Sequence, residues 1–280
     1  MPQKIKRAVI IKSANASIRV ESEGEAILAR IKRDPFLRKY IPSCEIILGS
    51  KNKADCKLII KRSRSFGVEL TYPMVRCFET SRADVKGLIS LIGYILERAR
   101  SEKCAYSIHS SVICKNGKAA VIFGGTTNLG KTSVAKTAAD KFGWSFYADE
   151  VAILDDRTRR VIGGVKTASG GDRFKSFALQ DDRTKPKISV FIHPHIDNGL
   201  NKIEKWDPAK FFWHLKEELA RKIRGGSKAI NFFSYPLDSL DTSSIARKRL
   251  QFAKTLSRRV KCYEIRGTPN FIAKAIDRLK

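Results

Sequence analysis

Apolar residues recur along the chain with two different periods, which predict strands and helices in the first hundred residues. Short runs of β-branched and other apolar residues predict four strands, at residues 7–12, 45–48, 57–62 and 67–71. Apolar residues three and four positions apart predict two helices, at residues 24–40 and 81–100. In the second helix, Ser81 is the expected N-cap and Asp84 follows three residues later, as in a capping box.

Strand-like and helix-like segments also alternate after residue 100, which predicts an α/β fold. Runs at residues 106–114 and 118–123 flank Lys115–Asn116–Gly117, and this turn sequence predicts a β-hairpin. The later segments are predicted in chain order as helix 131–142, strands 145–154 and 188–192, helices 207–223 and 242–258, strand 260–265 and helix 269–279. We therefore expect a small N-terminal α/β domain over residues 1–99 and a second domain over residues 100–280.

Basic residues outnumber acidic ones by a wide margin. The 280 residues include 55 Lys and Arg against 28 Asp and Glu, a net charge of +27 at neutral pH. A surplus of this size predicts an anionic partner, for which nucleic acid, an anionic membrane surface and mere solubility are the alternatives. No apolar run is long enough to span a bilayer, and we expect a soluble, cytoplasmic protein. Only three Gln and two Met accompany the charged residues, a composition that favours a thermophile.

Residues 125–132 read G-T-T-N-L-G-K-T and fit the phosphate-binding pattern G-x-x-x-x-G-K-[ST]. An apolar strand precedes them and an amphipathic helix follows, so backbone N–H groups and the helix N-terminus would both face the anion. We expect Lys131 to reach the β- and γ-phosphates of ATP or GTP and Thr132 to bind Mg²⁺. An ordinary Gly-rich loop is the alternative. The predicted nucleotide-binding residues are Gly125, Thr126, Thr127, Asn128, Leu129, Gly130, Lys131 and Thr132.

Two acidic residues interrupt the apolar strand predicted at residues 145–154. Asp149 and Glu150 are costly to bury there unless they take part in chemistry or pair with a cation. Asp149 is therefore the candidate base for an attacking hydroxyl, and Glu150 is a candidate ligand of Mg²⁺, directly or through water. The alternative is a pair of acids at an exposed strand end. His109 lies in the predicted strand 106–114, where a lone histidine is more often structural than catalytic.

Two further histidines follow the predicted strand 188–192. His193 and His195 precede Asp197 in F-I-H-P-H-I-D. A metal site, a loop beside the nucleotide and a plain strand end are the three interpretations of this string.

The stretch 107–154 contains S-I-H-S-S-V-I, then N-G-K-A-A-V-I-F-G-G-T-T-N-L-G-K-T, then Y-A-D-E-V. It resembles the catalytic domain of the HPr kinase/phosphorylase family, which has a Ser-Ile-His strand, a hairpin, a P-loop and an Ala-Asp-Asp strand in this order. The resemblance implies an HPr-kinase-like P-loop core in which Asp149 is the catalytic base and His109 assists it. Lys131 and Thr132 match the nucleotide and metal ligands. The P-loop lacks the family's Ser-Gly run and the second acid is Glu. The E-I-R-G string that follows the acid pair in HPr kinases occurs here near the C-terminus, at Glu264–Gly267, so neither phosphorylase activity nor recognition of the HPr protein is predicted.

Basic residues form clusters in both predicted domains. Each cluster by itself is consistent with a solvated face, but together they indicate an extended polyanion as partner. A folded RNA has that charge and also offers 2′-hydroxyl groups as phosphate acceptors. The candidate RNA-binding residues are Lys51, Lys53, Arg62, Arg64, Arg221, Lys222, Arg224, Arg247, Lys248, Arg249, Arg258 and Arg259.

The kinase-like core, the basic N-terminal region and the thermophile-like composition together resemble the archaeal RNA kinases. Those relatives of HPr kinase phosphorylate the 2′-hydroxyl of a tRNA uridine and so stabilise the tRNA against heat. The resemblance implies ATP or GTP with Mg²⁺ as phosphate donor and RNA, above all tRNA, as acceptor. The alternatives are a protein or small-molecule serine kinase with the same core, and an RNA-binding module without catalysis.

Overall fold

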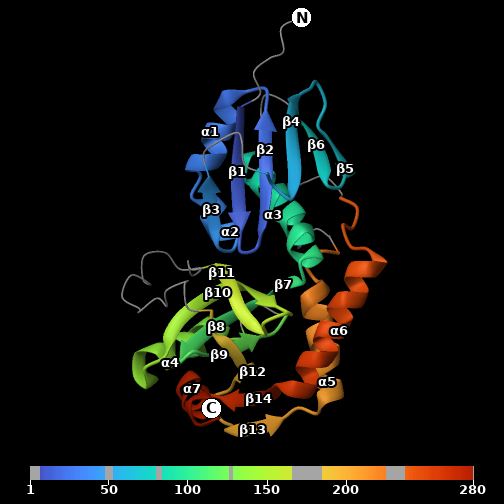
Figure 1. Cartoon of the computed structure of the whole chain (residues 1–280). Helices are drawn as coiled ribbons and strands as arrows, with labels where there is room; N and C mark the ends of the chain where they lie inside the picture. The colour runs from blue at the N-terminus through green and yellow to red at the C-terminus, as the bar shows by residue number, and fades with distance from the viewer. Residues whose placement is uncertain are drawn as a thin grey trace, which may run out of the picture. The chain divides into compact units, whose positions relative to one another are not determined.

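The structure is a computed structural model, and it describes residues 7–47, 53–79, 84–125, 129–165, 185–224 and 237–279. The chain divides into two compact units (Figure 1), Met1–Lys103 with Arg221–Ile245 and Cys104–Ala220 with Ala246–Lys280. Each unit contains one β-sheet together with helices, which confirms the predicted α/β class. Among the described residues, no helix is long and apolar enough to cross a membrane.

The first unit is built on a six-stranded sheet with the order β3-β1-β2-β4-β6-β5. Strands β2, β4 and β6 pair in parallel, and the other pairs are antiparallel. Alternate strand residues, such as Ile11, Ile18 and Leu58, pack with α1 and α3 in one core. The elements are β1 (Arg7–Ser13), β2 (Ala16–Ser22), α1 (Glu25–Arg33), α2 (Phe36–Tyr40), β3 (Cys44–Ile47), β4 (Cys56–Arg62), β5 (Gly67–Thr71), β6 (Met74–Glu79) and α3 (Val85–Glu102).

The helices of this unit differ from the prediction at their ends. The predicted helix 24–40 is two helices, because the proline at position 35 favours an extended backbone at Asp34, whose ψ is 120°. Helix α3 begins after Asp84, whose carboxylate accepts a hydrogen bond from the Lys86 N–H at 3.0 Å. Asp84 is therefore the N-cap in place of Ser81, which lies outside the described residues. The four predicted strands are confirmed, apart from residue 48, which is not described, whereas β2 and β6 were not predicted.

Residues 221–224 and 237–245 belong to the first unit, although the predicted boundary placed them in the second domain. The Tyr94 hydroxyl lies 3.2 Å from the carbonyl of Ile223 and 2.8 Å from that of Asp238, and it accepts a hydrogen bond from the Leu240 N–H. The Tyr94 ring is buried against Ile223, Leu240 and Ile245. Tyr94 and Ile223 are 129 residues apart, so no local pattern reveals this contact.

The second unit has three layers around a sheet with the order β11-β10-β8-β9-β12-β14-β13, with β7 paired to β10. Strands β9, β12 and β14 are parallel, and the remaining strands of this sheet pair antiparallel. The elements are β7 (Ala105–Ile108), β8 (Ser110–Lys115), β9 (Lys118–Phe123), α4 (Lys131–Phe142), β10 (Ser145–Asp155), β11 (Arg160–Val165), β12 (Lys187–Ile196), β13 (Lys202–Lys205), α5 (Pro208–Ala220), α6 (Ser243–Arg259), β14 (Lys261–Gly267) and α7 (Pro269–Arg278).

Both faces of this sheet are covered by helices. Along β9, Ala120 and Ile122 pack with α4 and α7, whereas Val121 and Phe123 pack with α5 and α6. Strands buried on both sides are continuous apolar runs, which is why β9 and β12 were predictable. At the β8–β9 hairpin, Asn116 has a φ of 53° as the predicted turn requires. The predicted strand 106–114 is broken into β7 and β8, and β11 and β13 were not predicted.

Candidate functional site

The predicted phosphate loop connects β9 to α4 in the second unit. Helix α4 begins at Lys131, directly after Gly130. Gly130 has a φ of +78°, and a Cβ at this position would lie 2.2 Å from Ile196 Cγ1. Conformation and space therefore both require glycine here. Thr126, Thr127 and Asn128 lie outside the described residues, whereas Gly125 and Leu129 are described.

The ammonium group of Lys131 lies against the start of the loop. Its Nζ donates a hydrogen bond to the Gly124 carbonyl at 3.1 Å, and the residue is buried. The first turn of a helix also presents backbone N–H groups and the positive end of the helix dipole. Cationic and N–H groups thus meet where the motif is predicted to bind phosphate.

Asp149 lies at the centre of a buried polar cluster formed by three elements. The Ser111 hydroxyl, from β8, donates a hydrogen bond to Asp149 Oδ1 at 2.5 Å. The Thr132 hydroxyl, from α4, lies 3.0 Å from Asp149 Oδ1 and 3.2 Å from Oδ2. Asp149 is only 1% exposed. Burial raises the pKa of the Asp149 carboxyl above its ordinary value, and the nearby Glu150 acts in the same direction, while the two hydroxyl bonds oppose them.

The backbone is irregular next to Asp149. Glu150 has a φ of +63°, and the pairing of β10 with β11 shifts register between Asp149 and Ala152. A left-handed conformation is rare for glutamate and marks a position that its surroundings enforce. On β11, a Cβ at Gly164 would lie 2.3 Å from the Ala148 Cβ, so glycine lets the strands approach at the bulge. The bulge re-aims adjacent side chains that a regular strand would point to opposite faces.

His109 lies between β7 and β8, and the structure places it beside the second acid. Its Nδ1 is 3.9 Å from Glu150 Oε2, with the His109 side chain 22% exposed and the Glu150 side chain 43% exposed. The family resemblance implies that His109 assists Asp149, and Thr132 and Glu150 are the predicted metal ligands. The structure brings Thr132 to Asp149 and His109 to Glu150, so all four residues lie at the same bulge, and their roles stay predictions.

The oxygen donors around Asp149 suit a hard cation. The carboxylate and the hydroxyl of Thr132 lie within hydrogen-bond distance, and Mg²⁺ prefers oxygen ligands from one or two carboxylates together with substrate phosphates. No three His, Cys, Asp or Glu side chains gather as a metal cluster in the part of the chain that the structure describes. A Mg²⁺ ion that enters with a nucleotide therefore fits beside the Thr132 hydroxyl and the Asp149 carboxylate.

A second cluster lies beside the loop, at the end of β12. His193 is close to Gly124, since a Cβ on Gly124 would lie 3.3 Å from His193 Nε2. The imidazole packs 5.0 Å, between ring centroids, from Trp206, and its Nδ1 is buried without a hydrogen-bond partner among the described residues. Burial lowers the pKa of His193 to about 4, so the ring is neutral at pH 7. Asp197 accepts hydrogen bonds from the Gly199 and Leu200 N–H groups in a turn, which favours the loop interpretation over a metal site with His195.

Glu264, on β14, also belongs to this second cluster. It pairs with His193 across β12 and β14. Burial raises the pKa of Glu264, but hydrogen bonds from Arg266, Trp206 and Lys210 outweigh burial and hold that pKa at about 2. The carboxylate is therefore charged at neutral pH.

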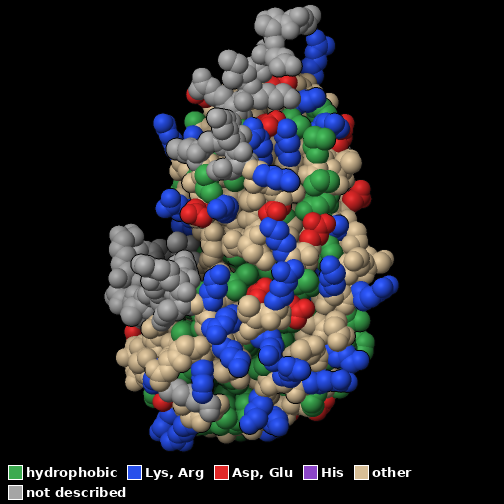
Figure 2. Space-filling view, viewed as in Figure 1, with side chains coloured by type: hydrophobic (Ala, Val, Ile, Leu, Met, Phe, Trp, Pro, Cys, Tyr) green, Lys and Arg blue, Asp and Glu red, His purple; other side chains and the backbone are tan. Residues whose placement is uncertain are grey.

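Most of the candidate RNA-binding side chains are exposed. Figure 2 shows many Lys and Arg side chains on the face of the molecule that is in view. Lys51 lies outside the described residues. Lys222 is half-buried, with its Nζ 5.7 Å from the Tyr40 ring centroid. Arg249 is buried on the inner side of α6, 4% exposed, and so cannot contact RNA. The exposed members are Lys53, Arg62, Arg64, Arg221 and Arg224 in the first unit and Arg247, Lys248, Arg258 and Arg259 in the second.

One feature of the site was not predicted from the residues. Ser111 donates the shortest hydrogen bond to Asp149, and it is one of several polar residues in a strand that starts with Ser110 and ends with Lys115. The contact between His193 and the loop agrees with one of the three interpretations of F-I-H-P-H-I-D, and it depends on β12 lying next to β9. No family model matches the chain, and no curated protein is significantly similar to it.

Proposed function

We propose that this chain is a P-loop kinase that transfers the γ-phosphate of ATP or GTP to an internal 2′-hydroxyl of RNA, with tRNA as the expected substrate. The observation that carries the proposal is the buried Asp149 carboxylate bound to Thr132, which follows Lys131 at the N-terminus of α4. A phosphotransferase needs a proton acceptor for the attacking hydroxyl beside a cationic phosphate site, and these residues supply both.

The proposed reaction is a direct transfer. Asp149 accepts the proton of the RNA 2′-hydroxyl while its oxygen attacks the γ-phosphorus. The bond between that phosphorus and the β–γ bridging oxygen breaks, and the nucleoside diphosphate leaves with the electron pair. Lys131 and the N-terminus of α4 offset the charge on the phosphate oxygens. Bound Mg²⁺, held by Thr132 and a carboxylate, would supply further neutralisation of the phosphates.

The raised pKa of Asp149 supports its role as a base. A carboxylate whose ionised form is disfavoured by burial has a stronger affinity for a proton than an exposed one. Ser111 and Thr132 orient the carboxylate with hydroxyl donors and keep it within the cluster. His109 assists Asp149 by way of Glu150, the next residue at the bulge. The His109 Nδ1 lies 3.9 Å from Glu150 Oε2.

The choice of RNA as acceptor rests on charge. A net charge of +27 and exposed basic residues on both units favour a polyanionic substrate over a free amino acid or a typical protein. Phosphate contacts dominate the affinity of proteins for RNA, so binding should weaken steeply with salt. A flat response to salt would contradict this choice.

Labelled ATP tests the proposal when tRNA, free serine and cell protein are offered as separate acceptors. We expect label in tRNA and none in the other two. Alkaline hydrolysis then locates it, because cleavage needs a free 2′-hydroxyl: an internal 2′-phosphate leaves the label in a dinucleotide, whereas a 5′-terminal phosphate leaves it in a mononucleotide. Label in serine or protein alone would overturn the RNA assignment, and label in no acceptor would overturn the kinase assignment.

A further inference from the structure

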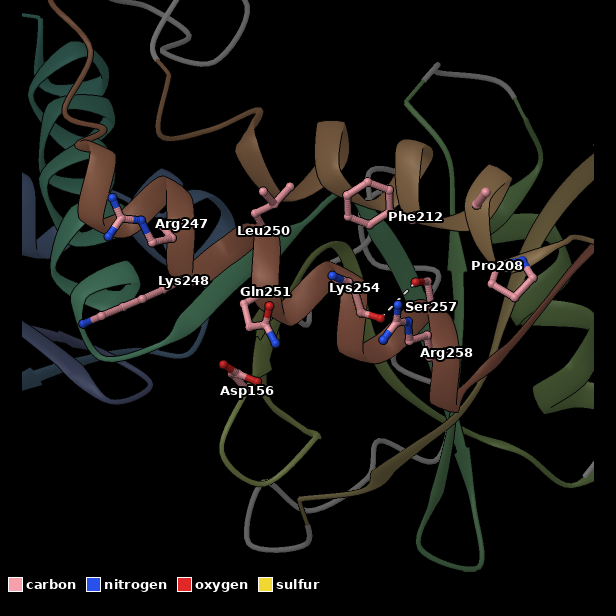
Figure 3. A pocket seen from close by; sticks show the side chains of 11 residues that line it. Asp156, Pro208, Phe212, Arg247, Lys248, Leu250, Gln251, Lys254, Ser257 and Arg258 are labelled. Atoms are coloured by element: carbon pink, nitrogen blue, oxygen red, sulfur yellow. Dashed lines mark hydrogen bonds between the residues drawn. The ribbon is translucent and has the colours of Figure 1, made fainter.

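A groove in the second unit lies between helices α5 and α6, apart from the residues of the proposed catalytic site (Figure 3). Its volume is about 840 Å³, and all of its lining residues belong to this unit. The basic lining residues are Arg247, Lys248, Lys254 and Arg258, all from α6 and all exposed. Phe212 from α5 and Leu250 from α6 supply apolar surface.

The basic side chains extend along the groove because of their helical spacing. Arg247, Lys254 and Arg258 are seven and four residues apart, so they lie on one side of α6. From Arg247 to Arg258 the helix rises about 17 Å. That length matches about five phosphates of a stacked strand, whose spacing is about 3.4 Å. The row therefore suits a strand that runs parallel to α6.

Negative charge is sparse along α6 and among the described residues that line the groove, although the exposed Asp207 lies next to its α5 end. Helix α6 has six basic residues and no acidic residue between Ser243 and Arg259. Among the described lining residues, Asp156 is the single acid, and burial raises the pKa of its carboxyl. A polyanion would meet little repulsion there.

The apolar residues distinguish a single strand from a duplex. Leu250 is 43% exposed and Phe212 is half-buried, and Figure 3 shows both on the α5 side of the row of α6 cations. Aromatic side chains beside a basic groove stack exposed bases in proteins that bind single strands. In a duplex the bases are already stacked on one another, so the ring of Phe212, whose edge contact is with Trp213, would have no base to stack on.

We propose that the groove between α5 and α6 binds a single-stranded segment of RNA, with its phosphates on Lys254 and Arg258 and one base against Phe212. That the bound RNA is also the substrate rests on the proposed function. The groove would hold a loop of the RNA while another part of the molecule enters the catalytic site. Binding and phosphate transfer are therefore measured separately.

Fluorescence anisotropy of a labelled, unstructured RNA of about 12 nucleotides, within the usual site size for single-strand binders, tests the assignment. The charge variant is Lys254→Gln with Arg258→Gln. Its matched control is Lys141→Gln with Lys274→Gln, which removes the same charge from exposed positions of the same unit outside the groove. Phe212→Leu removes the ring and keeps an apolar side chain. Thermal unfolding verifies that each variant is folded.

We expect the charge variant to bind about 10- to 100-fold more weakly, as loss of two solvent-exposed phosphate contacts implies. The slope of log affinity against log salt should fall by about 1.4. Phe212→Leu should lose about tenfold with an unchanged salt slope, and the control should change little. A blunt RNA duplex of equal length should bind more weakly than the single strand.

Three results would overturn the assignment. Equal weakening by the control would show diffuse attraction instead of a groove. Equal binding of the duplex would remove the single-strand assignment. Equal competition by poly-glutamate would identify an acidic polypeptide as the partner. If the wild-type chain binds RNA as expected but transfers no phosphate, the proposed function fails and the groove assignment stands. If RNA is phosphorylated and the groove variants bind normally, the groove assignment alone fails.

Discussion

Substitution of Gly130 by alanine is the most exact prediction that the phosphate loop offers. The left-handed φ of +78° costs an L-residue about 1–2 kcal/mol. The new Cβ would lie 2.2 Å from Ile196 Cγ1 and 2.6 Å from its Cδ1, and such overpacking costs about 1–3 kcal/mol more. We therefore expect Gly130→Ala to lower the free energy of unfolding of the second unit by about 2–5 kcal/mol.

Urea denaturation followed by tryptophan fluorescence measures this loss. All three tryptophans, Trp144, Trp206 and Trp213, lie in the second unit, so the signal reports on that unit. Gly143→Ala is the matched control, because Gly143 has a φ of +66° and open space around a Cβ, with only Lys115 Nζ at 4.0 Å. Gly143→Ala should cost only the backbone part, about 1–2 kcal/mol.

The contribution of the clash can be isolated with a second change. In Gly130→Ala/Ile196→Ala the nearest remaining atom, the Cβ at position 196, lies at an ordinary 3.7 Å. The loss of unfolding free energy in the double variant should therefore be about 1–3 kcal/mol smaller than the sum of the losses in the two single variants. Additivity within about 0.5 kcal/mol, or a loss in Gly130→Ala no larger than in Gly143→Ala, would refute the reasoning.

Three further predictions concern the polar groups of the site. The pKa of His193 is lowered to about 4, so the second unit should lose stability as pH falls from about 6.5 toward 4, because the unfolded histidine binds a proton first. In His193→Phe, the free energy of unfolding from urea denaturation should change less with pH over this range. A variant whose free energy of unfolding falls in parallel with that of wild type would contradict the prediction. Asp149→Asn should stabilise the unit at neutral pH, with an advantage that disappears as pH falls through the raised pKa of the wild-type carboxyl; a variant less stable than wild type at pH 7 would oppose this. Thr132→Val should slow phosphate transfer by about 10- to 100-fold while Thr132→Ser retains it, and equal rates in a transfer assay would remove the hydroxyl from the mechanism.

The parts of the site that could be predicted from the sequence are those encoded by neighbouring residues. The run ending at Phe123, the glycines and Lys131 define a strand, a loop and a helix, and β9 and α4 begin and end where the apolar pattern places them. The cost of burying Asp149 in an apolar strand singled it out, and the structure buries it at the N-terminus of α4. Local signals were sufficient for these residues.

The parts that could not be predicted depend on register and on distant contacts. His109 lies beside Glu150 at a bulge where the Glu150 backbone is left-handed, and no sequence pattern predicts that conformation. The burial of Arg249 depends on which side of α6 faces the sheet. Residues 221–224 and 237–245 belong to the first unit through contacts with Tyr94 and Arg98, which are far away in the sequence. Each of these features depends on tertiary structure, because the order of apolar and polar residues does not show which face of an element is buried or which distant residues meet.

The central claim is that Asp149 activates an internal hydroxyl of RNA for phosphate transfer. Mass spectrometry of tRNA after incubation with ATP and Mg²⁺ measures this directly, for wild type and for Asp149→Asn in parallel. We predict one added internal phosphate on tRNA with the wild-type chain, and a rate about 10²- to 10⁴-fold lower with the folded variant, as loss of a general base implies. An unmodified tRNA with the wild-type chain, or undiminished transfer by Asp149→Asn, would contradict the account.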